Sequence, residues 1–365
     1  MSASSGISLL SRALVDPAAC LLWDVRDWET LLQQARRANL LARLALGFER
    51  AGLLSQVPAG PRRHFDSVQK VVDSQERAVR WEVGQIAHAL HDLGAPVLLL
   101  KGAAYVMAGL PAAQNRLFAD VDILVPRPQL EAVEYALQAE GWQNVHHDAY
   151  DQRYYREWMH EIPPMRHQRR DTVIDVHHNI LPLTSRLAVD AKLLLAQAVP
   201  IAGWPGLYRL DDVDLVLHSA CHLFLDGEFD KGLRDLVDLD ALLRHFGGQL
   251  NFWGDLQARA RALGLGRVLF YALRYSAKIL QTPVPREALR SLRDVAPDTA
   301  TLAWMDGLFL RALQPDHPSS EDAWTGAARR LLYLRAHWMR MPLGLLIRHL
   351  ATKALRREPE DAAPV

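Results

Sequence analysis

The spacing of hydrophobic and polar residues changes twice along the chain and so defines three zones. Residues 1–94 carry apolar side chains at helical spacing up to a stop signal at Gly94, which predicts an N-terminal helical region. Residues 95–187 contain short apolar runs bounded by Pro and Gly, a pattern typical of buried strands. From 188 to 365 the helical spacing returns and predicts a C-terminal helical domain.

The two helical zones show different kinds of helix. The N-terminal zone is expected to contain one long helix over residues 61–93. The C-terminal zone is expected to contain shorter helices that are mostly separated by Pro or Gly. These segments are 188–197, 211–225, 231–246, 252–263, 266–280, 286–294, 299–313 and 321–357.

The middle zone is expected to form a small mixed sheet. The predicted strands are 96–100, 120–125 and 172–177, together with a hairpin of 153–160 and 164–169. Helices are predicted over 103–110 and 129–140. Many helices around one small sheet indicate an α+β fold, in which the sheet is embedded between the N-terminal helical segment and the C-terminal all-helical region.

Composition narrows the class of protein. Of the 365 residues, 50% are hydrophobic and 23% are charged, which excludes a disordered chain. The 42 Lys and Arg residues balance 42 Asp and Glu residues, so a specific nucleic-acid partner is not expected. The two cysteines indicate a reducing compartment, and we find neither an export signal nor a membrane-spanning apolar run. A cytoplasmic protein is expected.

Asp120-Val121-Asp122 is the sharpest chemical feature of the sequence. Alternate residues of a strand point to the same face, so the two carboxylates would lie side by side among apolar neighbours. Such an arrangement is costly unless a cation neutralises it. Oxygen ligands suit Mg²⁺, so one interpretation is a magnesium site. The other is a strand end whose acids are solvated or paired with arginine.

Two further features lie on the neighbouring strands. Asp175 interrupts an apolar strand, where Asp is disfavoured, and it would act either as a metal ligand or as an ordinary ion-pair partner. Lys101-Gly102 follows the first strand and opens a helix, a place where backbone can approach a phosphate. A simple strand-to-helix turn would show the same two residues.

In this order, these motifs resemble a known family. The matching segments are Leu98-Leu-Leu-Lys-Gly-Ala-Ala104, Arg116, Asp120-Val-Asp-Ile-Leu-Val125 and Ile174-Asp-Val-His177. They are similar to the uncharacterised nucleotidyltransferase family of bacterial proteins, within the polymerase-beta-like superfamily. The motifs cover about residues 95–180, and the helical flanks extend the resemblance less specifically to most of the chain.

The resemblance implies a metal-dependent nucleotidyl transfer. Asp120, Asp122 and Asp175 would hold two Mg²⁺ ions that bridge the triphosphate of an NTP such as ATP, and Asp175 could also act as the base. Two ions bracket the attacking and leaving oxygens of an in-line displacement. The acceptor would carry a hydroxyl group, on a sugar, a small metabolite or a protein.

The resemblance also assigns the nucleotide-binding residues. Gly102 and the amide groups after it would cradle phosphates, and Lys101 or Arg116 would add positive charge. Ala103 departs from the wider superfamily, which usually has a serine there. The alternative is therefore a catalytically weak or inactive module of the same fold that binds a nucleotide or a partner.

Histidines on and near these elements form a second group of candidates. His218, Cys221 and His222 share one predicted helix, and histidines four residues apart occur in zinc sites. No further Cys or His pair has suitable spacing, so a packed helix face is the favoured interpretation. His177 points the same way as Asp175 and would either contact substrate or simply end the strand.

Two charged segments complete the set. Asp235 and Asp238 share a helix face and are expected to be solvated and paired with arginines, or else to line the acceptor side of a cleft. Between residues 323 and 357 there are eight Lys and Arg residues and no acid, beside a leucine stripe. This pattern fits either a packed terminal helix or weak contact with an anionic membrane surface.

Overall fold

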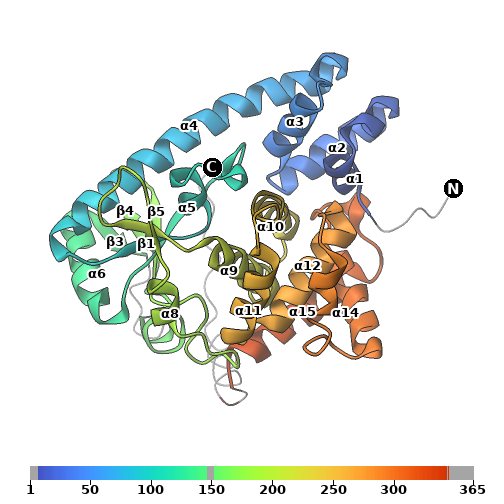
Figure 1. The fold of residues 1–365 in the computed structure, drawn as a ribbon. Coiled ribbons are helices and arrows are strands. Elements are labelled where there is room, and N and C mark those ends of the chain that lie inside the picture. The colour runs from blue at the N-terminus through green and yellow to red at the C-terminus, as the bar shows by residue number, and fades with distance from the viewer. Residues whose placement is uncertain (1–6, 146–151, 343, 345–365) are drawn as a thin grey trace.

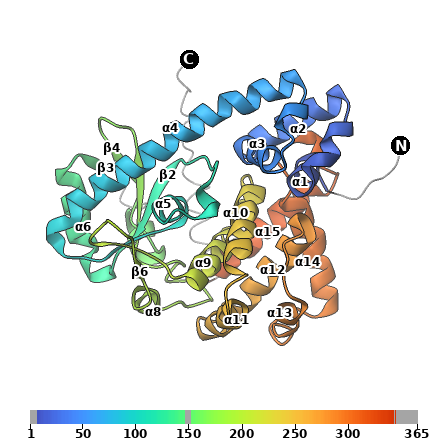
Figure 2. The same ribbon diagram turned by 45° about the horizontal axis from the view of Figure 1, so that its top comes forward.

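The computed structural model describes residues 7–145, 152–342 and 344, and it confirms the predicted α+β class. The N-terminal helices are α1 (Leu9–Val15), α2 (Val25–Arg37), α3 (Leu41–Arg50) and α4 (Ala59–Leu90). α4 is 32 residues long and runs from the other N-terminal helices to the sheet (Figures 1 and 2). It confirms the long helix expected over residues 61–93.

A mixed sheet occupies the middle of the chain in the order β3-β4-β5-β2-β1-β7-β6. Its strands are β1 (Val97–Leu99), β2 (Asp120–Leu124), β3 (Trp142–Asn144), β4 (Met165–His167), β5 (Val173–His177), β6 (Val199–Pro200) and β7 (Leu207–Arg209). β2 pairs antiparallel with β1 and parallel with β5. The three strands that are predicted from apolar runs thus lie side by side. Helices cover them, and covered strands need apolar side chains. Two helices accompany them, α5 (Lys101–Met107) and α6 (Leu130–Ala139).

Parts of the sheet differ from the prediction. Residues 153–160 do not form a strand, because Tyr154–Trp158 is a short π-helix in which the Tyr154 and Trp158 rings pack edge-on. The segment 164–169 does contain a strand, β4, but it pairs with β3 and β5. β3, β6 and β7 were not predicted. Strands of two or three residues are too short to show a period, and they depend on pairing with a neighbour.

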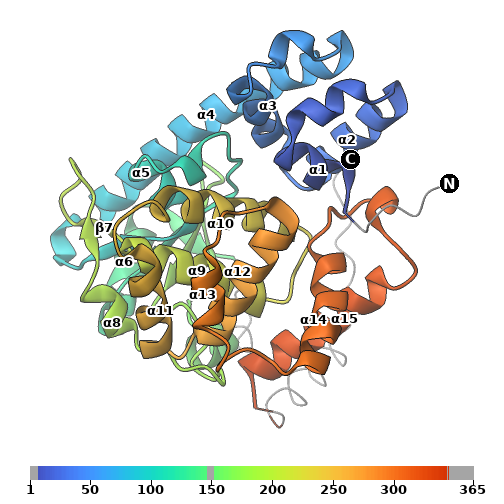
Figure 3. The same ribbon diagram turned by 45° about the vertical axis from the view of Figure 1, so that its right-hand side comes forward.

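The C-terminal region is mainly helical. Its helices are α8 (Ala191–Leu195), α9 (Asp212–Leu225), α10 (Gly232–Phe246), α11 (Phe252–Ala262), α12 (Gly266–Leu280), α13 (Arg286–Arg290), α14 (Thr299–Ala312) and α15 (Thr325–Arg340). α14 and α15 lie side by side (Figure 3). Residues 343 and 345–357, which carry much of the proposed basic membrane-contact segment, lie outside the described residues. Within the part of the chain that is described, no helix combines the length and apolarity needed to cross a membrane.

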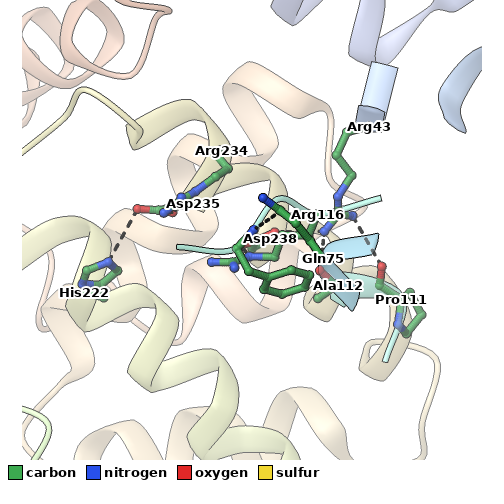
Figure 4. Close-up of polar contacts among 10 residues, drawn as sticks. Arg43, Gln75, Pro111, Ala112, Arg116, His222, Arg234, Asp235 and Asp238 are labelled. Carbon is green, nitrogen blue, oxygen red and sulfur yellow. Dashed lines mark hydrogen bonds and ion pairs between the residues drawn. The ribbon is translucent and has the colours of Figure 1, made fainter. Parts of the chain in front are cut away.

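A buried ion network joins the N-terminal helices to the sheet region. Asp238 of α10 is 4% exposed and accepts hydrogen bonds from Arg43 of α3 at 3.0 Å and from Arg116, before β2, at 2.7 Å (Figure 4). Arg43 also donates to the carbonyl of Ala112. The expectation of a solvated Asp238 is therefore wrong, although its arginine partners were expected. Burial is tolerated here because the charges are paired.

Replacement of Asp238 by Ala should destabilise the fold strongly. The change leaves two buried guanidinium groups without their shared counter-ion, a loss of about 3–5 kcal/mol in the free energy of unfolding. Urea denaturation followed by circular dichroism measures it. The matched control is Asp66→Ala, which breaks an exposed pair with Arg62 and should have a far smaller effect. Equal urea midpoints for Asp238→Ala and the wild type would contradict the assignment.

Candidate functional site

Strand pairing places the three aspartates on one face of the sheet. In the parallel pair of β2 and β5, Asp122 lies directly opposite Asp175. Asp120 is two residues before Asp122, and alternate residues of a strand share a face. His177 is two residues beyond Asp175 and projects from the same side. These four side chains form the centre of the candidate site.

Lys101 reaches this centre from the end of β1. Because β1 is antiparallel to β2, its last residues lie beside the start of β2, and the Leu100 amide donates to the Asp122 carbonyl at 2.9 Å. Lys101 has a φ of 42°, in the left-handed region that is unfavourable for a residue with a side chain. Its ammonium nitrogen lies 2.9 Å from Asp122 Oδ1. The backbone at Lys101 thus adopts a rare conformation beside a carboxylate that its side chain neutralises.

Asp122 is the buried anion of the site. It is 3% exposed, and its Oδ1 accepts hydrogen bonds from Lys101 and from His177 Nε2, the latter at 3.1 Å. Burial alone would raise the pKa of Asp122, but Lys101 and His177 together hold it well below its usual value. In return, Asp122 helps to raise the pKa of Lys101 although burial opposes this. Asp122 is therefore ionised.

Asp120 and Asp175 have the opposite electrostatic character. The Asp120 side chain is exposed at the start of β2, yet desolvation by neighbouring protein atoms and the charge of Asp122 raise its pKa. Burial, Asp122 and Glu161 raise the pKa of Asp175 to about 7. Asp175 Oδ1 is buried without a hydrogen-bond partner among the described residues. An unpaired carboxylate oxygen beside two other carboxylates fits a hard divalent cation such as Mg²⁺.

The residues expected to bind phosphate are arranged around the start of α5. Gly102 and Ala103 are buried there. A Cβ atom on Gly102 would lie 2.8 Å from the Phe118 ring and would collide with the Arg116 guanidinium, so glycine permits this packing. Arg116 is held by Asp238, yet it is near enough to Asp120 to lower the pKa of that carboxyl. Lys101 therefore lies among the carboxylates of the site, and Arg116 lies next to them.

His160 and Glu161 also belong to the site, and they were missed by the sequence analysis. Glu161 forms a β-bridge with His177, and the Ile162 amide donates to the Val176 carbonyl at 3.0 Å. Glu161 Oε2 lies 3.2 Å from His177 Nδ1. The prediction had placed His160 at the end of a strand and assigned nothing to Glu161. No spacing in the sequence reveals that this segment pairs with β5.

The histidines of α9 close one side of the site. His218, Cys221 and His222 line a small cavity of about 40 Å³ together with Lys101 and His177. Burial lowers the pKa of both histidines well below the usual value, and it raises the pKa of the Cys221 thiol. They are neutral, packed groups, and His222 faces Asp235 (Figure 4).

A comparison with protein families identifies the class of this protein. The family described as "Uncharacterised nucleotidyltransferase" matches residues 24–281, a span that contains the whole sheet and the three aspartates. The chain belongs to this family of uncharacterised nucleotidyltransferases, which makes it a transferase in general type. Neither the curated proteins nor the solved structures that were compared with the chain gave a significant match.

Magnesium should stabilise the folded protein through Asp120 and Asp175. A ligand that binds only the native state at 100 times its Kd adds about 2.7 kcal/mol to the free energy of unfolding. Thermal unfolding of EDTA-dialysed protein, with and without Mg²⁺, measures this gain. The double variant Asp120→Asn, Asp175→Asn should lose it. Asp171→Asn, at an exposed position in the turn before β5, should keep it. An equal gain in stability for the wild type, the double variant and Asp171→Asn would contradict a metal site at the aspartates.

Proposed function

We propose that the protein is a Mg²⁺-dependent nucleotidyltransferase that moves an NMP from an NTP to the hydroxyl group of an acceptor. The observation that carries the proposal is the set of three carboxylates, Asp120, Asp122 and Asp175, on one face of β2 and β5. Family membership supports the general kind of reaction. Mg²⁺ would supply charge neutralisation and polarisation of the triphosphate when bound. The acceptor would be a sugar, a small metabolite or a protein side chain.

In this proposal the three aspartates have different roles. Asp120 is exposed to solvent at the start of β2, and Asp175 has a buried Oδ1 with no hydrogen-bond partner among the described residues, so these two have oxygens available to a metal ion. Asp122 completes the set, and it uses Oδ1 for its contacts with Lys101 and His177. Asp175 would also accept the proton of the acceptor hydroxyl. The acceptor oxygen then bonds to the α-phosphorus while the bond to pyrophosphate breaks and pyrophosphate leaves.

The cations beside these carboxylates would position the triphosphate. Lys101 lies 2.9 Å from Asp122, and Arg116 is fixed by Asp238 at 2.7 Å. Gly102 permits the approach of Arg116 to the start of α5, and in this proposal the guanidinium would contact a phosphate there. Ala103 is buried and offers no hydroxyl to a phosphate.

The second candidate is a binding module that holds a nucleotide without transferring it. One observation favours it: Ala103 is buried and offers no hydroxyl group at the position where the wider superfamily usually has a serine. The lost contact would reduce transfer more than it reduces binding if it acts mainly in the transition state. Calorimetry with ATP, GTP, CTP and UTP in the presence of Mg²⁺ would separate the two functions when it is combined with an assay of pyrophosphate release. Metal-dependent binding without release across many acceptors would identify the module.

Substitution of Asp120 or Asp175 by Asn should slow transfer strongly and leave the fold intact. Loss of one charge-stabilising group in an active site reduces the rate roughly 10²–10³-fold. Incorporation of labelled NTP into a lysate, read together with pyrophosphate release, measures the rate, and Asp171→Asn is the control. If both variants keep wild-type turnover, the site assignment is wrong.

Asp122→Asn should differ from these two variants, because it affects the fold as well as transfer. The change removes the counter-ion of Lys101, which is largely buried, so a lower urea midpoint should accompany the loss of activity. Loss of activity with an unchanged midpoint would show that Lys101 does not depend on Asp122.

A further inference from the structure

A second group of potential metal ligands lies at the end of β5. Among the described residues, His160, Glu161 and His177 are the group of three whose ligand atoms all lie within 4.8 Å of one another. Backbone pairing holds them in place, since Glu161 bridges to His177 and the His178 amide donates to the His160 carbonyl at 2.8 Å. The two imidazole rings face each other with their centroids 5.2 Å apart. This donor set is separate from the three aspartates.

The orientation of His177 leaves one ring nitrogen available. Its Nε2 lies 3.1 Å from Asp122 Oδ1, so the proton of the neutral ring belongs on Nε2. Nδ1 then carries a lone pair, and it lies 3.2 Å from Glu161 Oε2. Atoms bound to one tetrahedral zinc ion at about 2.1 Å would lie roughly 3.4 Å apart. A carboxylate that fixes the distal nitrogen of a ligating histidine is the usual outer partner of such a site.

The unsatisfied nitrogens point to a missing ligand. His160 Nδ1 and His177 Nδ1 are both buried and make no hydrogen bond within the described part of the chain. The 3.2 Å approach of Glu161 to His177 is close, but its alignment is not that of a hydrogen bond. A protonated His177 between Asp122 and Glu161 would account for one ring only. It would leave His160 Nδ1 buried and unpaired, which costs free energy.

The surroundings suit a cation with an open coordination position. Asp122, Glu161 and Asp175 lie around His177, and Lys101 and Arg340 are neighbouring cations that oppose them. The cavity of about 40 Å³ borders both histidines and exceeds the roughly 10–15 Å³ that one water needs. The end of α15, at Met339 and Arg340, closes it on the other side.

We propose that His160, Glu161 and His177 bind a divalent transition-metal ion of the zinc class. Glu161 Oε2 and His177 Nδ1 are two of its ligand atoms, and a ring nitrogen of His160 is the third. Two imidazoles and one carboxylate are a donor set that Zn²⁺ accepts, whereas Mg²⁺ prefers oxygen ligands alone. Asp122 orients His177 from outside the coordination sphere. A water in the cavity would take the remaining position.

Titration of EDTA-dialysed full-length protein with Co²⁺ tests this site directly. In the presence of excess Mg²⁺, which would occupy the aspartates, we expect one Co²⁺ per chain, a visible d–d absorption band, and displacement of Co²⁺ by Zn²⁺. His160→Ala and Glu161→Gln should lose the band and most of the affinity. Asp122→Asn should weaken binding by roughly 10–100-fold, as changes to outer partners of a metal site do.

Three controls keep the outcome clear. His91→Ala and Glu157→Gln change exposed residues of the same types and should bind Co²⁺ as the wild type does. Asp120→Asn should also keep the band, because Asp120 is outside this donor set. Circular dichroism confirms that each variant is folded. The proposal is overturned if the wild type takes up no Co²⁺, or if the folded double variant His160→Ala, Glu161→Gln binds it as tightly. Neither result depends on nucleotide transfer.

Discussion

A buried, ionised carboxylate at Asp122 requires hydrogen-bond donors around it, and this requirement organises the centre of the molecule. Lys101 begins α5 directly after β1, and His177 ends β5. β1 and β5 lie on either side of β2, and both residues donate to the same oxygen of Asp122. Without these donors, burial would favour the protonated acid. With them, Asp122 stays charged, and burial together with this charge raises the pKa of Asp120 and of Asp175 beside it. The pairing of one anion thus contributes to the electrostatic state of its neighbours.

A second buried anion, Asp238, fixes the frame around that centre. Its bonds to Arg43 and Arg116 join α3, α10 and the segment before β2. Arg116 therefore cannot move freely toward the carboxylates, although it is near enough to act on Asp120. The equal numbers of acidic and basic residues in the chain include such specific pairs, so zero net charge is compatible with a strongly polarised site.

The sequence predicted the elements whose local pattern is strong. β1, β2 and β5 are largely buried, so each appears as an apolar run, and an acid within such a run is conspicuous. The long α4 was equally visible from its periodicity. The short strands β3, β6 and β7 were not, and the aromatic segment at Tyr154–Trp158 was taken for a strand. These elements depend on partners that are distant in sequence, and the pattern of a single sequence carries no information about such partners.

By itself, the sequence determined the α+β class, the three central strands and the shared face of Asp120 and Asp122, because period and apolar character are local properties. Only the tertiary structure decided which charges meet. Asp238 is buried with two arginines rather than solvated, and Gly102 makes room for Arg116. His160 and Glu161 join the site through the β-bridge between Glu161 and His177. The physical reason is that burial and pairing depend on neighbours in space, and the spacing of residues along the chain does not record them.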